Sequence, residues 1–161
     1  LEVGGHPMAA GFGLLLEKQE RVIEQLHNLA RTQIAQEDLV PTMYPECHLP
    51  ADLLTLETCK IIRQFAPFGQ KNPEPLWQIT FDAVESVTYI GANKQHIKLR
   101  LFDQSTGTYI DALGWNLAES VGTTLDNGTP GAALEVVAAL EINSWKGTDR
   151  TQLRIVDLRS S

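Results

Sequence analysis

A change of hydrophobic period at Leu76 constrains the fold of this chain more than any other feature. From that residue on, apolar and polar side chains alternate, first in Trp77–Ala83 and again in Ile97–Leu101. A period of two sends successive side chains to opposite faces of a strand, so these segments predict half-buried β-strands. The pattern predicts three further strands, at residues 108–115, 134–142 and 152–158.

Turn residues separate the five predicted strands and indicate how they connect. Each gap contains a glycine close to Asn, Ser, Thr or Asp. The longest gap holds Asn116 to Leu125, which leaves room for a short helix. Five strands with an insert between the third and the fourth are the layout of the OB-fold, a five-stranded Greek-key barrel. The sequence therefore predicts an OB-fold barrel over residues 76–161.

Helical patterns come before the strands. Leu14–Ile34 has apolar residues at helical spacing and charged residues on its other face, and Pro50–Gln64 begins with a proline that suits a helix start. Three prolines within 65–75 exclude both a helix and a central strand there. We expect an α+β chain in three parts: residues 1–36, a helical connector over 37–75, and the barrel over 76–161.

The charge balance argues against nucleic acid until its distribution is considered. Thirteen Lys and Arg against twenty Asp and Glu give a net charge of −7, whereas phosphate binders usually have a basic surface. Binding depends on a local patch, however, and the segment 94–101 gathers positive charge. In a strand, Ile97, Leu99 and Leu101 would fill the barrel, and Lys94, His96, Lys98 and Arg100 would line the outer face, about 6.8 Å apart.

This basic strand face predicts an oligonucleotide platform, because OB-folds bind nucleic acid around their second and third strands. Candidates for stacking on bases are Tyr89, Tyr109, Trp115 and Trp145. An equally weighted alternative is a solvated face whose charges only blunt a sheet edge. A second basic group, Lys146, Arg150 and Arg154, follows Trp145, and a charged hairpin tip is its simpler interpretation.

Several function classes find no support in the residues. There is no phosphate-binding glycine loop, zinc-binding spacing, nucleophile elbow or paired-carboxylate site, so the sequence predicts no catalytic centre of its own. Two cysteines, Cys47 and Cys59, are too few for a disulfide framework, and no apolar stretch reaches the length of a membrane span. We expect a cytoplasmic protein with no membrane partner.

Four stretches together resemble one family. Residues 4–11 read Gly-Gly-His-Pro-Met-Ala-Ala-Gly, which resembles the signature of the DHH-associated domain of phosphoesterases. Residues 66–77, with Pro-Phe-Gly and Asn-Pro-Glu-Pro, resemble the segment that leads into the OB-fold of RecJ nucleases. Residues 96–101 and 143–153 resemble strand and turn signatures of that same fold. The order of these motifs indicates the RecJ family.

The resemblance implies a 5′-to-3′ exonuclease specific for single-stranded DNA that acts in DNA repair and recombination. It also implies that the metal-dependent DHH domain, with Mn²⁺ or Mg²⁺, lies upstream of Leu1, so that these 161 residues alone would need no cofactor and would be inactive. Residues 1–36 would be the end of the DHH-associated domain. Carried over from the family, Gly4 and Gly5 would allow a close backbone approach to a phosphate, and His6 would donate a hydrogen bond to it.

The expected role is to hold single-stranded DNA for that active site. One alternative is a docking module that binds the acidic tail of single-strand DNA-binding protein. Another is part of a different DHH-type phosphodiesterase, acting on short RNA or cyclic dinucleotides. The residues expected to contact nucleic acid are Gly4, Gly5, His6, Lys94, His96, Lys98, Arg100, Trp145, Lys146 and Arg154.

Overall fold

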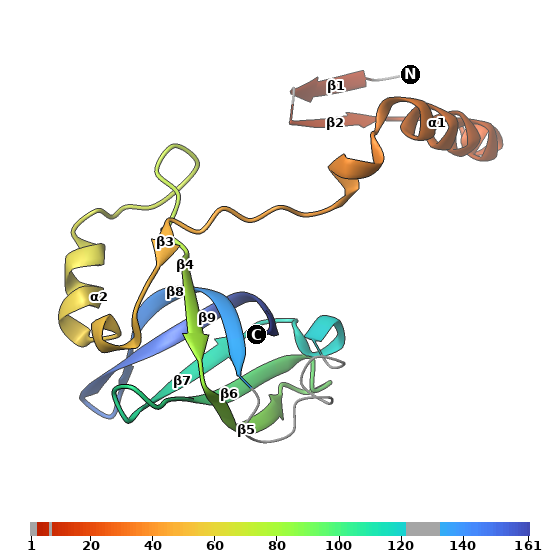
Figure 1. The fold of residues 1–161 in the computed structure, drawn as a ribbon. Coiled ribbons are helices and arrows are strands. Elements are labelled where there is room, and N and C mark those ends of the chain that lie inside the picture. Colours follow the sequence, from red (N-terminus) through yellow and green to blue (C-terminus); the bar gives the residue numbers. More distant parts are fainter. Residues whose placement is uncertain (1–2, 7, 122–132) are drawn as a thin grey trace. The chain divides into compact units, whose positions relative to one another are not determined.

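The computed structural model describes residues 3–6, 8–121 and 133–161 (Figure 1). The chain forms two compact units, Leu1–Met43 and Tyr44–Ser161. The three-part division expected from the sequence, with boundaries after residues 36 and 75, stays a prediction.

The first unit consists of a hairpin and a helix. Strand β1 (Val3–His6) pairs antiparallel with β2 (Ala9–Phe12), and helix α1 (Gln19–Gln33) confirms the helix predicted there. A Cβ atom on Gly5 would lie 2.7 Å from the Cβ of Ala10, so this position in the hairpin needs a glycine. No described residue of the unit is buried, and most of its large apolar side chains are exposed.

The second unit is a seven-stranded sheet with the order β3-β4-β8-β9-β7-β6-β5. All neighbours are antiparallel except β3 with β4 and β7 with β9, which are parallel. The strands are β3 (Cys47–His48), β4 (Trp77–Phe81), β5 (Ala83–Ile90), β6 (His96–Asp103), β7 (Thr108–Gly114), β8 (Leu134–Trp145) and β9 (Thr148–Ser160).

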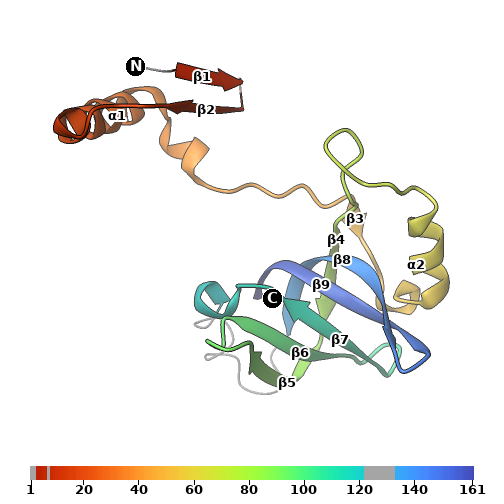
Figure 2. The same ribbon diagram turned by 180° about the vertical axis from the view of Figure 1, so that it is seen from behind.

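The sheet curls because β4 and β5 are two halves of one bent strand. Only Asp82 separates them. Strand β4 nevertheless pairs with β8 near one end of the strand order, and β5 pairs with β6 at the opposite end. The backbone N–H of Asp82 donates to the carbonyl of Phe102 at 3.0 Å. Seen from both sides, the strands wrap round a common interior (Figures 1 and 2). The five-stranded OB-like architecture predicted from the sequence is confirmed, with β4 and β5 together as its first strand.

The core consists of the inward side chains of these strands. Ile79, Ile97, Leu99, Val136 and Leu153 have no accessible surface. Removing such a side chain from water stabilises the fold by about 1.5–3 kcal/mol. Strand alternation thus supplies the barrel interior.

The sequence prediction ended the first strand near Ala83 and therefore missed β5. Residues 85–89 are all exposed, so the strand has no buried face along most of its length. A buried face is what produces alternation in a sequence, which explains why the pattern stopped there. Pairing with β6 makes these residues a strand.

The segment before the barrel contributes to the sheet and covers it. The predicted helix 50–64 is divided into a 3-10 turn and helix α2 (Leu56–Arg63), which starts where the Thr55 hydroxyl accepts the N–H of Thr58 at 3.1 Å. Helix α2 packs against β8 and β9. Burial raises the pKa of its Cys59 thiol, with weaker opposing contributions from Thr151 and Arg63.

Arg154 ties the loop before β4 to the barrel. Residues 65–75 are irregular, as predicted, and the Asn72 amide donates to the carbonyl of Phe65 at 2.8 Å. In the same loop, Glu74 forms an ion pair with Arg154, whose Nε lies 2.5 Å from Oε1 of Glu141. Burial by itself would lower the pKa of Arg154, but the hydrogen bond to Glu141 and the charges of both carboxylates raise it.

Asp103 closes the turn between β6 and β7. Its Oδ1 accepts from the Ser105 hydroxyl at 2.7 Å and from the N–H and hydroxyl of Thr106, both at 2.8 Å. Burial would raise the pKa of Asp103, but these hydrogen bonds lower it below its usual value. The carboxylate therefore replaces backbone partners in a tight turn.

The insert between β7 and β8 is described only in part. A helical turn runs from residue 118 to residue 121, and the rest of the predicted helix, 122–125, lies outside the described residues. None of the helices in the described part is long and apolar enough to cross a membrane.

Replacing Asp103 with Ala should lower the free energy of unfolding at pH 7 by about 1–3 kcal/mol, because the N–H of Thr106 loses its acceptor. The pKa is depressed in the folded state, so this contribution is complete above the ordinary carboxyl pKa of about 4 and is lost as the pH falls below it. Urea unfolding at pH 7 and pH 3 checks both points. The exposed Asp157 gives the control, Asp157→Ala, and an equal loss there would contradict the assignment.

Replacing Arg154 with Ala should destabilise the barrel by about 1–2 kcal/mol, because two carboxylates are then left facing each other in a partly buried site. The side chain of Arg154 is 30% exposed, so full burial costs do not apply. Arg159→Ala is the matched control, since that arginine pairs with Glu135 while 73% exposed. Thermal unfolding should separate the two variants, and adding Glu74→Gln to Arg154→Ala should restore part of the loss.

Candidate functional site

The alternation predicted for the basic strand face is present in β6. Leu99 and Leu101 are fully buried, whereas Lys98 and Arg100 point outward and are exposed. The two cations therefore share one face of the barrel.

That face is not an uninterrupted positive stripe, because both cations have acidic partners. Nζ of Lys98 lies 3.1 Å from Oδ2 of Asp111 on β7, and Nε of Arg100 lies 2.8 Å from Oε2 of Glu85 on β5. The register explains the pairs, since β6 has β5 on one side and β7 on the other. All four side chains are about half exposed, so each pair contributes only about 0–1 kcal/mol.

Lys94 and His96 do not extend the stripe. Lys94 precedes β6 and lies in a turn with φ 54°, where its N–H donates to the carbonyl of Gly91 at 3.1 Å. The Nδ1 atom of His96 accepts the N–H of Asn116 at 2.9 Å, and its ring meets Trp115 edge-on at 4.8 Å. The prediction that Lys94 lines the same strand face as Lys98 is wrong, because Lys94 lies outside β6. His96 belongs to β6, but its ring packs against the start of the insert between β7 and β8.

Residues of the second basic group have different surroundings. Arg154 is held by Glu74 and Glu141, so its guanidinium is a structural clamp and not an open phosphate contact. Lys146 occupies the two-residue turn between β8 and β9 with φ 49°, a conformation typical of tight hairpins. Trp145 precedes it and is 71% exposed.

Gly4, Gly5 and His6 lie in the β1–β2 hairpin of the other unit. The N–H of Met8 donates to Nδ1 of His6 at 3.4 Å, and the three residues are exposed. Their expected contact with a phosphate stays a prediction.

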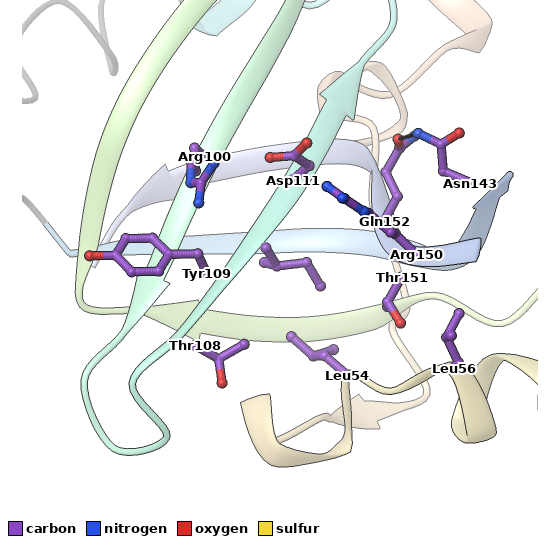
Figure 3. Close-up of a pocket in the computed structure, with 11 residues that line it drawn as sticks. Leu54, Leu56, Arg100, Thr108, Tyr109, Asp111, Asn143, Arg150, Thr151 and Gln152 are labelled. Atoms are coloured by element: carbon purple, nitrogen blue, oxygen red, sulfur yellow. Dashed lines mark hydrogen bonds between the residues drawn. The ribbon is translucent and has the colours of Figure 1, made fainter. Parts of the chain in front are cut away.

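Three adjoining cavities, of about 340, 510 and 200 Å³, run over β5, β6, β7 and the β8–β9 hairpin. Asp111 lines all three, and they also share Lys98, Arg100, Asn143 and Arg150 pairwise, so they form one depression that we call the Asp111 groove. Figure 3 shows the side chains at its centre, where Asp111 on β7 lies near Arg100 and Arg150.

The Asp111 groove is cationic and carries exposed aromatic rings. Among the described residues that line it, four are Lys or Arg (Lys98, Arg100, Lys146 and Arg150) and one is acidic, Asp111. The guanidinium of Arg100 lies 5.1 Å from the centre of the Tyr109 ring, and Trp145 borders the far part of the groove. A polyanion with flat apolar groups fits such a surface.

Asp111 and Asn143 are missing from the residues predicted for the site, and Arg150 was assigned only to the hairpin tip. Asp111 and Asn143 enter the groove through strand pairing, opposite Arg100 and Arg150 respectively. Those pairings join positions 11 and 7 residues apart in the chain. A register assumed for each hairpin from its turn could have found them.

Metal chemistry finds no support in the described part of the chain. The described residues contain no group of three or more His, Cys, Asp or Glu side chains that could hold a metal ion.

Comparison with known proteins gives relatives that share one name. The chain is 32% identical over 96% of its length to the single-stranded-DNA-specific exonuclease RecJ of Bacillus subtilis, and 28% identical over 96% to that of Haemophilus influenzae. It spans 19% and 26% of the length of these two proteins.

A solved structure agrees with these relatives. RecJ from Thermus thermophilus, determined in complex with Mg²⁺, matches all of this chain with a TM-score of 0.71 and 26% identity, over 23% of its own length. A second structure of that protein, in complex with Mn²⁺, matches equally well over 22%. The family model described as the RecJ OB domain matches residues 46–157, from just before β3 to near the end of β9. The chain belongs to the RecJ OB domain family.

Proposed function

We propose that the barrel binds single-stranded DNA in the Asp111 groove and holds it for a RecJ-type exonuclease. The observation that carries this proposal is the charge of the groove. Its described lining has four cations against one carboxylate, in a chain whose net charge is −7. A positive depression on an acidic protein is hard to explain by solubility alone.

The groove offers both interactions that single strands use. Lys98, Arg100 and Arg150 can neutralise phosphates and release their counterions, which makes binding salt-dependent. Tyr109 and Trp145 present ring surface on which bases can stack, for about 1–3 kcal/mol each. Neither interaction reads a base sequence, which suits a nuclease that must accept any strand.

The ion pairs of Lys98 and Arg100 do not prevent this use. Exposed pairs are weak, so a phosphate can replace a carboxylate at little cost. The pairs hold two long side chains at the groove while it is empty.

In the complete protein, the proposed role is to feed a strand to the metal-dependent catalytic domain, in DNA repair and recombination. The relatives are named for an exonuclease specific for single-stranded DNA, which supports this assignment. Gly4, Gly5 and His6 would contact a phosphate of the strand. Cys47 and Cys59 are both free thiols, which is compatible with the cytoplasm.

A protein partner with an acidic tail, such as single-strand DNA-binding protein, is the second candidate. The same four cations would attract it, so charge alone does not separate the two ligands. Titration with an oligothymidine and with an acidic peptide, each competing with the other, tests them. Binding of the peptide alone would replace the first proposal by the second.

Replacing Lys98 and Arg150 with Gln should weaken oligothymidine binding by about tenfold or more, since two charge-assisted phosphate contacts are lost. The slope of log K against log salt should become shallower by about 0.7 for each lost phosphate contact. Fluorescence anisotropy over a series of salt concentrations measures both quantities.

The matched control is Lys71→Gln, which removes an exposed charge that lines none of the three cavities. It should change affinity less than twofold. Unchanged affinity and slope in the double variant Lys98→Gln/Arg150→Gln would remove the groove as the binding surface.

Replacing Trp145 with Ala should weaken binding by about 5- to 150-fold, the cost of one lost stacking partner of about 1–3 kcal/mol. Trp115→Ala should have little effect, because Trp115 packs on His96 and lines none of the three cavities. The same anisotropy titration compares the two variants. A larger loss for Trp115→Ala would move the stacking site to the other end of β7.

A further inference from the structure

We infer that Asp111 serves the groove as an internal anion: it occupies the place of a phosphate when the groove is empty and thereby limits the affinity for single-stranded DNA. The inference rests on the proposed function and names the residue that sets how tightly the groove holds its ligand. It assigns to an acidic residue a role in binding an acidic polymer.

The strand neighbours of Asp111 are themselves residues of the groove. It lies on β7, directly opposite Arg100 of β6 on one side and Gln152 of β9 on the other. Its Oδ2 is 3.1 Å from Nζ of Lys98. In Figure 3 its carboxylate lies between the side chains of Arg100 and Arg150. Asp111 thus pairs with Lys98 and lines the same cavity as Arg100 and Arg150.

The positive and negative charges that line the groove are unequal in number. Asp111 lines all three cavities and is the only acid among their described lining residues. A carboxylate and a phosphodiester both present two oxygens that share one negative charge, so both satisfy the same cationic donors. A phosphate that enters this part of the groove must displace the carboxylate from Lys98, or lie beside it and be repelled.

Because the side chains of Asp111 and Lys98 are exposed to water, Asp111 weakens the binding of a DNA strand but does not prevent it. Its side chain is 40% exposed and that of Lys98 is 47% exposed, so water screens the pair and it breaks easily. The carboxylate of Asp111 can therefore turn toward solvent when a strand enters the groove. A ligand held weakly at each phosphate can be exchanged quickly, as a strand that must advance through a nuclease requires.

The other acids near the groove differ from Asp111. Glu85 pairs with Arg100 from the β5 side and lines none of the three cavities. Asp149, in the β8–β9 hairpin, accepts a hydrogen bond from the Ser144 hydroxyl at 2.5 Å and also lines none of them. Asp111 is thus the acid that a strand in the groove meets.

The test is the isosteric variant Asp111→Asn in the 161-residue chain, titrated with oligothymidine over a series of salt concentrations. Removal of one repulsive charge near a bound phosphate should raise the affinity about three- to tenfold at low salt. The salt slope should steepen by about 0.7, because Lys98 then pairs with a phosphate without giving up an internal partner.

Two further variants isolate the cause. Asp157→Asn removes the same charge from an exposed position of β9 that lines none of the three cavities, and it should change affinity less than twofold. The double variant Lys98→Gln/Asp111→Asn should lose the steeper slope, because the cation that Asp111 had occupied is gone. Circular dichroism confirms that each variant keeps its strands.

The outcomes separate this inference from the proposed function. Tighter binding and a steeper slope in Asp111→Asn, but not in Asp157→Asn, support the inference. An unchanged or weaker affinity in Asp111→Asn, with Lys98→Gln/Arg150→Gln still impaired, overturns it and leaves the binding groove in place. Failure of the wild-type chain to bind any oligothymidine overturns both.

Discussion

The burial of one face of β6 is the constraint on which the rest of the barrel wall depends. Ile97, Leu99 and Leu101 have no accessible surface, and their removal from water is a main stabilising contribution in this part of the core. Because a strand alternates, that burial forces Lys98 and Arg100 to the outside. The charged face is therefore a consequence of the core, and it cannot move unless the whole register of β6 shifts.

The neighbours of β6 turn this charged face into a groove. Strand β5 supplies Glu85 and β7 supplies Asp111, so each cation has an acidic partner on the adjoining strand. The β8–β9 hairpin adds Arg150 and Trp145 along the same depression. Arg154 acts elsewhere, since it joins β9 to β8 and to the loop before β4. Arginines four residues apart on one strand thus have different roles, one lining the groove and one stabilising the fold.

Much of the fold was predictable because burial on one face leaves a pattern in the sequence. The strands near Trp77, Ile97 and Leu134 all have such a face, the helix near Val22 has an amphipathic pattern, and the structure has each of them. Strand β5 has almost no buried face, and β3 is two residues long, so neither could be found from its own pattern. The site was predicted less well. Arg154 was expected at the nucleic acid, but Glu74, 80 residues away in the chain, is one of its partners.

The sequence by itself determined which side chains of the strands face the core and which face water, because strand periodicity is a local property. It also determined that Lys98 and Arg100 share a face. Only the tertiary structure decided what lies beside them, because partners such as Glu85 and Asp111 come from other strands through sheet register. It likewise decided that Arg150 lines the groove, whereas Arg154 forms ion pairs with Glu74 and Glu141. The sequence does not distinguish these two arginines of one strand, because the elements that surround them come from other parts of the chain.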